Sequence, residues 1–229
     1  MHRGFAPHGA CSVVVPNIAA MGAAMVSNSP VCIVDDDESV RQSLRVLLES
    51  AEFKVRDYSS ADAFLADDIF GASCLITDIR MPRMDGLALQ QEVARRRHDL
   101  PVVIISGHGE VQLAVTAMKA GAVDFFEKPF DNEAFLSSVR RAIEIGERTR
   151  TQETESHAAR RLIALLTRRE RAVLDELVCG LSNKAIALKL GISPRTIEVY
   201  RAQIMDKLRA NSLSDLVRAS LAASRSCHN

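Results

Sequence analysis

Charged and hydroxyl side chains stand at the ends of several short apolar segments in the N-terminal part of the chain. They are the acidic run Asp35–Glu38, the carboxylate of Asp78, the hydroxyl of Ser106 and the ammonium of Lys128. Carboxylates that converge in one pocket repel each other unless a cation lies among them, and ligands that are all oxygen indicate Mg²⁺ or Mn²⁺. A hard divalent cation is therefore the predicted cofactor.

These residue types together can carry out phosphoryl chemistry. With a cation in place, the carboxylate of Asp78 can act as a nucleophile toward a phosphoryl group, while Lys128 and Ser106 neutralise the incoming oxygens. Alone, the run Asp35–Glu38 would indicate a solvated acidic segment or a helix cap. Its coincidence with the other three residues, all at predicted strand ends, favours a single site.

The segments that position these residues predict a doubly wound α/β fold with a five-stranded parallel sheet. Short apolar runs alternate with stretches of helical period, and the carboxyl ends of parallel strands share one edge, where ligands bind. The second run is the most polar, which indicates an edge strand. The predicted strands are Val31–Val34, Phe53–Arg56, Cys74–Thr77, Val102–Ile105 and Val123–Phe126, and the predicted helices are Ser39–Ser50, Ala61–Ala66, Leu87–Arg97, Val111–Ala120 and Asn132–Glu147.

Beyond the fifth predicted helix the composition of the chain changes. Residues 148–160 carry almost no large apolar side chains, so we predict a linker in which that helix continues and then frays. Only helices are predicted after it, and two of them, joined by the tight turn 191–193, form a helix-turn-helix pattern. These helices run from the capping box at Thr167 to Cys179, from Ser182 to Leu190, from Pro194 to Leu208 and from Ser212 to Ala222.

Residues 29–147 closely resemble the receiver domain of bacterial response regulators. The resemblance implies the flavodoxin-like arrangement of the five strands. At position 106 the serine retains the hydroxyl of the more usual threonine. The matching segments are Val34–Asp37, Thr77–Gly86, Ile105–Gly109 and Asp124–Phe130.

The resemblance also implies a phosphate acceptor and a metal site. Asp78 would receive a phosphoryl group from a sensor histidine kinase. Mg²⁺ would be held by Asp36, Asp78 and the backbone carbonyl of Arg80, with Asp35 contributing through water.

A conformational switch is implied in the same way. Phosphorylation would draw the Ser106 hydroxyl inward and let Phe125 turn into the vacated space, which alters the surface of the fourth helix, fifth strand and fifth helix. For Phe125 the alternative is an ordinary core aromatic. The Lys128-Pro129 peptide bond is expected to be cis.

The predicted helix that begins at Pro194 has two different faces. Its inward face carries Ile197, Tyr200, Ile204 and Leu208, whereas its outward face is polar with two small apolar side chains that suit thymine methyl groups in a major groove. Glu198 can accept from a cytosine amino group, and the basic residues nearby are candidates for phosphate contacts. Plain solvent exposure is the alternative for each. The predicted DNA-binding residues are Asn183, Lys184, Arg195, Thr196, Glu198, Val199, Arg201, Ala202 and Lys207.

Residues 160–224 resemble the LuxR-type DNA-binding domain. Tyr200 stands where that family usually has histidine and is expected to pack equivalently. A receiver followed by this domain is the organisation of the NarL/FixJ family of two-component response regulators. The sequences of the motifs are most similar to those of the FixJ branch. The matching segments are Leu166–Arg171, Gly180–Ala187 and Ile192–Val199.

The family resemblance implies how such a chain works. The unphosphorylated receiver masks the DNA-binding domain, and phosphorylation promotes a homodimer through the face of the fourth and fifth helices. A dimer matches a two-fold operator in double-stranded DNA, and RNA polymerase is the implied further partner.

Length and charge agree with two domains. The chain has 229 residues and a net charge of zero, which hides an asymmetry: residues 1–158 carry 16 basic and 23 acidic residues, while residues 159–229 carry 13 and 6. A basic tail on an acidic body indicates a polyanionic partner. We predict a disordered extension over residues 1–28, a receiver over 29–147, a linker over 148–160 and a DNA-binding domain over 161–229.

Several other properties limit where the protein works. No uninterrupted apolar stretch reaches the length of about 18 residues that a membrane span requires. The five cysteines are odd in number and form no C-x-x-C pair, which favours a reducing cytoplasm. Residues 1–24 precede Met25 and are either a disordered tail or an upstream start.

Two other functions are compatible with parts of the pattern. An aspartate-nucleophile phosphatase of the haloacid-dehalogenase type also uses a strand-end Asp and Mg²⁺, but it needs a second Asp where this chain has Arg80. A regulator that binds nucleic acid independently of phosphate is the other alternative. Apart from self-dephosphorylation, we therefore expect no enzymatic turnover.

Overall fold

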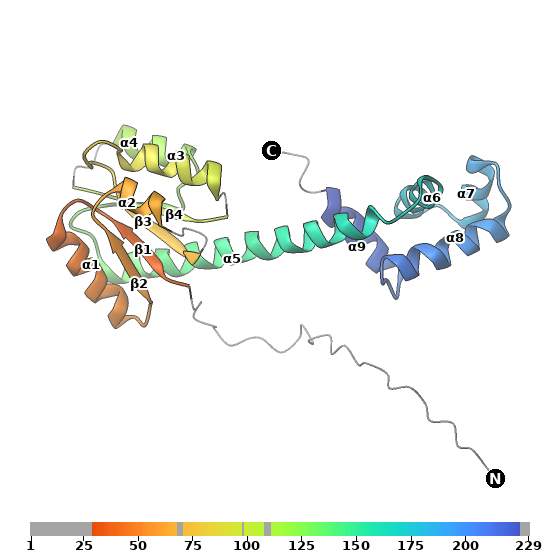
Figure 1. Ribbon diagram of the computed structural model, residues 1–229, viewed down its shortest axis with the longest axis horizontal. Coiled ribbons are helices and arrows are strands. Elements are labelled where there is room, and N and C mark those ends of the chain that lie inside the picture. Colours follow the sequence, from red (N-terminus) through yellow and green to blue (C-terminus); the bar gives the residue numbers. More distant parts are fainter. Residues whose placement is uncertain (1–28, 68–70, 98, 108–110, 225–229) are drawn as a thin grey trace, which may run out of the picture.

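The computed structural model describes residues 29–67, 71–97, 99–107 and 111–224. Its first part is built on a parallel sheet of five strands in the order β2-β1-β3-β4-β5, as predicted (Figure 1). The polar second strand lies at one edge of this sheet. The strands are β1 Val31–Val34, β2 Val55–Tyr58, β3 Cys74–Asp78, β4 Val102–Ser106 and β5 Asp124–Glu127.

Helices cover both faces of the sheet, because successive side chains of each buried strand point to opposite sides. On one face, Ile33 and Ile76 pack with the helices α1 (Glu38–Ser50) and α5 (Asn132–Ile163). On the other face, Leu75 and Ile104 pack with α2 (Ala61–Ala66), α3 (Gly86–Arg96) and α4 (Val111–Lys119). Two apolar cores therefore hold the strand ends in place.

The second strand lies two residues later than the prediction Phe53–Arg56, which was wrong at this boundary. A turn after α1 brings Glu52 to a positive φ of 66°, and the Phe53 amide donates to the carbonyl of Leu48. Phe53 packs against the core in this turn, and the strand begins only at Val55, which pairs with Val31.

Helix α5 is longer than predicted, because the fraying expected within residues 148–160 does not occur. The helix is continuous from Asn132 to Ile163 and joins the sheet-containing part to the helical part (Figure 1). Arg150 bonds to Asp99 at 3.1 Å, and Ser156 is buried farther along the helix. Contacts at both ends thus stabilise a segment that has few large apolar side chains of its own.

The described C-terminal residues, up to 224, form four helices and no strand, with boundaries close to the predicted ones. Thr167 caps α6 in a capping box with Glu170, and Ser182 and Ser193 cap the next two helices. Their core is formed by side chains such as Leu174, Ile186 and Ile204, together with the end of α5. The helices are α6 Arg168–Val178, α7 Asn183–Leu190, α8 Pro194–Lys207 and α9 Leu213–Ser224.

No helix in the described ranges is long and apolar enough to cross a membrane. The predicted N-terminal extension, residues 1–28, lies outside the described residues.

Candidate functional site

The carboxyl ends of β1, β3, β4 and β5 bring together the four groups that the sequence singled out. Asp35 follows β1, Asp78 ends β3, Ser106 ends β4 and Lys128 follows β5. Asp35, Asp78 and Ser106 are 2%, 7% and 1% exposed. The Lys128 ammonium donates to Asp35 Oδ2 at 2.8 Å and to Asp78 Oδ1 at 2.7 Å. One buried site therefore contains two carboxylates and one ammonium.

Backbone groups hold the two carboxylates from the other side. The Asp37 amide donates to Asp35 Oδ1 at 2.8 Å, and the Arg80 amide donates to Asp78 Oδ2 at 2.7 Å. Both carboxylates thus accept one backbone and one charged hydrogen bond, so their orientation is well defined.

Gly86 lets the loop after β3 fold back against the site. Its amide donates to the carbonyl of Ile79 at 2.9 Å, and a Cβ atom at this position would lie only 2.1 Å from the carbonyl oxygen of Asp78. Only glycine permits this approach, which brings the start of α3 against the end of β3.

Arg41 is a site residue that the sequence reasoning missed. Its Nη1 donates to the carbonyl oxygens of Asp35 and Asp36 at 2.9 and 3.1 Å, which holds the acidic run at the end of β1. The sequence signal that could have identified Arg41 is its position on the first predicted helix, six residues after Asp35. Asp36 itself is exposed, next to the buried Asp35.

The site carries more negative than positive charge. Burial raises the pKa of the Asp35 carboxyl, against the lowering effect of its hydrogen bond from Lys128. Burial alone would lower the pKa of Lys128, but hydrogen bonds to Asp35 and Asp78 carry it above its ordinary value. One ammonium between two buried carboxylates leaves a net negative charge that a cation can offset.

The donor set fits a hard divalent cation. Within the described ranges, no three His, Cys, Asp or Glu side chains gather around a single point, so the convergent carboxylates are the pair Asp35 and Asp78. Mg²⁺ typically takes one or two carboxylates and keeps several waters, which matches a pair of carboxylates with an exposed Asp36 and Arg80 beside them.

The predicted switch aromatic lies on the α4 side of the sheet. Phe125 is half-buried in β5, opposite Ile104, and packs against the core cluster that includes Ala117 of α4. The Lys128-Pro129 peptide bond is cis, as the resemblance implied.

A second cluster of predicted residues lies on the helix-turn-helix, α7 and α8. Gly191 adopts a positive φ of 67° in the turn, and Pro194 opens α8. Ile197 and Ile204 are buried and Tyr200 is half-buried, whereas Glu198, Val199 and Ala202 are exposed. The inward and outward faces of α8 are therefore those that its periodicity predicted.

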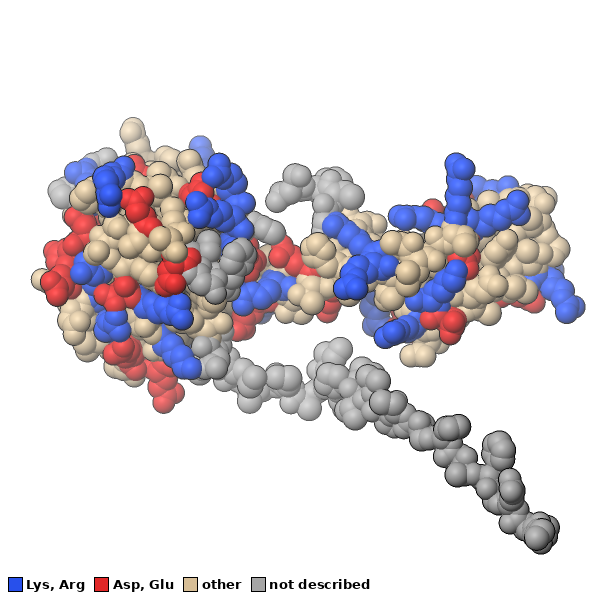
Figure 2. Space-filling model, viewed as in Figure 1, with Lys and Arg blue, Asp and Glu red and all other residues tan. Residues whose placement is uncertain are grey.

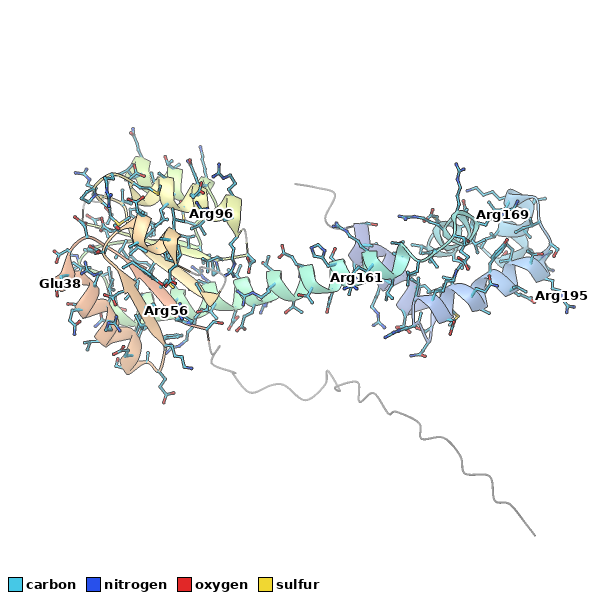
Figure 3. The ribbon with its side chains drawn as sticks, in the orientation of Figure 1. Glu38, Arg56, Arg96, Arg161, Arg169 and Arg195 are labelled. Atoms are coloured by element: carbon cyan, nitrogen blue, oxygen red, sulfur yellow. The ribbon has the colours of Figure 1, made fainter. Side chains whose placement is uncertain are left out.

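The basic residues of this region differ in what they contact. Lys184 and Arg195 are exposed and form no ion pair within the described ranges. Arg195 projects from the helical part of the chain (Figure 3), and other Lys and Arg side chains also lie on the surface of this part (Figure 2). Arg201 instead donates to Asn183 Oδ1 at 2.8 Å and joins α8 to α7. Thr196 shares a 2.8 Å hydrogen bond with Ser193 at the start of α8.

Lys207 bonds within the protein rather than projecting outward. Its ammonium donates to both carboxylate oxygens of Glu170, at 2.8 and 2.7 Å. This hydrogen bond is the main cause that lowers the pKa of Glu170, whose side chain also accepts from the Thr167 amide. Lys207 thus joins α8 to α6, a contact that the helical wheel of α8 did not reveal.

Comparisons with known proteins agree with both parts of the structure. Residues 31–140 match the response regulator receiver domain, and residues 164–220 match the bacterial regulatory proteins of the luxR family. The transcriptional regulatory protein FixJ of Azorhizobium caulinodans is 48% identical over 201 residues, which cover 87% of this chain and 95% of that protein. FixJ of Bradyrhizobium diazoefficiens is 44% identical and covers 87% and 98% of the two chains.

Solved structures show the same organisation. The response regulator StyR superposes with a TM-score of 0.71 at 38% identity and covers 84% of this chain and 98% of its own. Full-length FixJ from B. japonicum superposes with a TM-score of 0.53 at 43% identity and covers 87% and 98%.

The fold and the two sites therefore define a two-domain response regulator. The chain belongs to the response regulators in which a receiver domain is followed by a LuxR-type DNA-binding domain, and it is similar to FixJ over most of its length. It is a DNA-binding protein that regulates transcription under the control of phosphorylation by a kinase. The relatives named above are regulators rather than enzymes, so the family match does not support the phosphatase alternative.

Proposed function

We propose that Asp78 accepts a phosphoryl group from a phosphohistidine of a sensor histidine kinase and that this phosphate controls DNA binding. The observation that carries the proposal is the buried Asp78 carboxylate, held by the Lys128 ammonium and the Arg80 amide at the carboxyl end of β3. An oxygen of Asp78 forms a bond to phosphorus while the bond from phosphorus to the histidine nitrogen breaks and the imidazole keeps the electron pair. Lys128 then neutralises part of the added charge.

A divalent cation, Mg²⁺ or Mn²⁺, completes the proposed site. Asp35, Asp36, Asp78 and the carbonyl of Arg80 would hold it, which is supported by the oxygen-only donors and the excess negative charge of the pocket. When bound, the cation neutralises phosphoryl oxygens as a Lewis acid. Any turnover by the protein itself would be limited to loss of its own phosphate.

The proposed output of the receiver is a change on the α4 face. The Ser106 hydroxyl would bond to the phosphate, and Phe125 would turn inward into the space beside α4. The exposed side chains Val111, Val115 and Met118, which are 76%, 46% and 46% exposed, form an apolar stripe on α4. This stripe supports a homodimer of the phosphorylated protein through α4, β5 and α5.

The outward face of α8 is proposed to read DNA. Arg195, Glu198, Val199 and Ala202 would enter the major groove of double-stranded DNA, while the start of α7, at Lys184, would contact phosphate. Asn183, Thr196, Arg201 and Lys207 already have partners within the protein and would position or supplement this surface. Contact with RNA polymerase in the cytoplasm would follow promoter binding.

DNA binding with and without phosphate tests this proposal. Wild type, Asp78→Ala and the surface control Asp62→Ala are incubated with a small phosphodonor and Mg²⁺ at one salt concentration. Intact-mass spectrometry measures phosphorylation, and fluorescence anisotropy measures binding to upstream duplexes. For wild type and Asp62→Ala only, we expect one phosphoryl group per chain and tighter DNA binding with the phosphodonor than without it. Equal binding by Asp78→Ala would remove Asp78 as the control, and phosphorylation of Asp78→Ala would place the acceptor elsewhere.

A further inference from the structure

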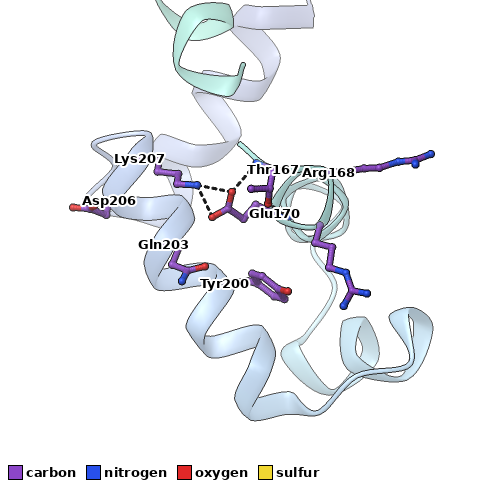
Figure 4. Close-up of a pocket in the computed structure, with 8 residues that line it drawn as sticks. Thr167, Arg168, Glu170, Tyr200, Gln203, Asp206 and Lys207 are labelled. Carbon is purple, nitrogen blue, oxygen red and sulfur yellow. Dashed lines mark hydrogen bonds and ion pairs between the residues drawn. The ribbon is translucent and has the colours of Figure 1, made fainter. Parts of the chain in front are cut away.

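A cleft beside α8 is lined by eight residues, of which only Lys207 is assigned above to DNA contact. It has a volume of about 650 Å³ and opens between the start of α6 and one flank of α8 (Figure 4). Figure 4 shows Tyr200 between the two helices and the ion pair of Glu170 with Lys207 at one end. The lining residues are Thr167, Arg168, Arg169, Glu170, Tyr200, Gln203, Asp206 and Lys207.

Some charged side chains of this cleft form an ion pair with each other, and the other charged side chains do not. Glu170 and Lys207 neutralise each other at 2.7 Å. Arg168 and Arg169 are exposed and form no ion pair within the parts of the chain that are described, and Asp206 is the one remaining carboxylate of the lining. The cleft therefore keeps an excess of positive charge although its lysine is already bound.

Neutral hydrogen-bond donors adjoin these arginines. The Tyr200 hydroxyl and the Gln203 amide line the cleft and make no hydrogen bond with another described group. A guanidinium, a phenol and a primary amide around one open space are donors that an oxyanion accepts well. The chemistry of the lining thus favours an anion with several oxygens.

The position of the cleft identifies the source of that anion. Gln203 lies one helical turn after Val199, on the edge of the outward face of α8, and Tyr200 lies between this edge and the core. A helix seated in a major groove has a sugar-phosphate strand along each flank. The start of α7 lies along one flank of α8 through the Arg201 to Asn183 bond, and the cleft lies along the other, beside α6.

We infer that this cleft binds the DNA phosphate backbone, with Arg169 as the charged contact and Tyr200 and Gln203 as neutral donors. The inference rests on the proposed DNA-binding role of α8 and extends it from one phosphate strand to both. The cleft adds affinity that is independent of base sequence, because phosphates carry no sequence information.

The salt dependence of binding tests the cleft. Phosphorylated wild type, Arg169→Ala and Arg171→Ala are titrated into a fluorescein-labelled duplex of mixed sequence over a series of KCl concentrations. Arg171 is the matched control, since it is exposed on the same helix, has no ion pair within the described ranges and does not line the cleft. A lost phosphate contact lowers the slope of log K against log salt by about 0.9.

We expect that decrease for Arg169→Ala and the wild-type slope for Arg171→Ala. Gln203→Ala should weaken binding at every salt concentration and keep the wild-type slope, because it removes a neutral donor. A wild-type slope for Arg169→Ala, or equal losses for Arg169→Ala and Arg171→Ala, overturns the cleft assignment. Failure of wild type itself to bind DNA overturns the proposed function, and the cleft assignment with it.

Discussion

Removal of the Lys128 ammonium is the perturbation with the clearest physical consequence. In Lys128→Ala, two carboxylates that are 2% and 7% exposed lose the ammonium that bonds to both. Loss of one partner of a buried ion pair costs about 3 to 5 kcal/mol. The Lys128 side chain is 23% exposed, so solvent screens part of the interaction and we expect a loss of about 2 to 3 kcal/mol.

Hydrogen exchange of the β1 and β3 amides measures this loss without the need for a tryptophan, which the chain lacks. If these strands exchange through unfolding of the receiver, about 2 to 3 kcal/mol corresponds to exchange that is about 30- to 150-fold faster. Peptides from α6 and α8 are the internal control, because those helices belong to the separate helical core.

The pH dependence has a definite sign. Asp35 has a pKa that is raised by burial, and loss of Lys128 removes the main group that lowers it. A carboxyl whose pKa is raised on folding destabilises the folded state above its ordinary pKa of 3.8. The effect of Lys128→Ala should therefore be largest near neutral pH and should shrink as the pH falls toward the raised pKa of Asp35.

A second substitution separates charge from packing. Asp35→Asn in the Lys128→Ala background removes the uncompensated carboxylate and retains an oxygen for the Asp37 amide, so we expect it to restore about half of the lost stability. The reasoning is refuted if Lys128→Ala exchanges like wild type at neutral pH, or if Asp35→Asn makes the double variant less stable still.

Two further predictions concern the loop after β3 and the far end of the sheet. Gly86→Ala should abolish phosphorylation of Asp78 and lower the stability by about 1 to 3 kcal/mol, because the added Cβ would lie 2.1 Å from the Asp78 carbonyl oxygen. Intact-mass spectrometry measures the phosphorylation and urea unfolding measures the stability. Normal phosphorylation would contradict the steric explanation. Hydrogen bonds from Arg97, and to a lesser extent Arg150, lower the pKa of Asp99 to about 2, so its contribution to stability is present above pH 3.8 and lost as the pH falls toward 2. Asp99→Asn should remove that part of the acid dependence in urea unfolding from pH 5 to about pH 2, and an unchanged pH profile would show that Asp99 does not carry it.

Much of the receiver follows from local patterns in the chain. Four of the five strands begin within one residue of their predicted start, because continuous apolar runs have few alternatives to a buried parallel strand. The convergence of Asp35, Asp78, Ser106 and Lys128 follows from topology, since each lies at a strand end and parallel strands share that edge. Caps such as Thr167 could also be predicted, because a capping box depends on residues only three apart.

Contacts between distant segments required the tertiary structure. Lys207 was predicted to contact phosphate, but its ammonium binds Glu170, 37 residues away. The continuous helix α5 is stabilised by the contact of Arg150 with Asp99 and by the burial of Ser156, which are contacts between distant parts of the chain. Hydrophobic period and capping depend on residues close together in the chain, so the sequence by itself determined the helices and strands. Because it placed the strand ends, it also determined which residues form the acidic site. The partners of long charged side chains depend on which helices become neighbours in space, so only the folded structure decided them.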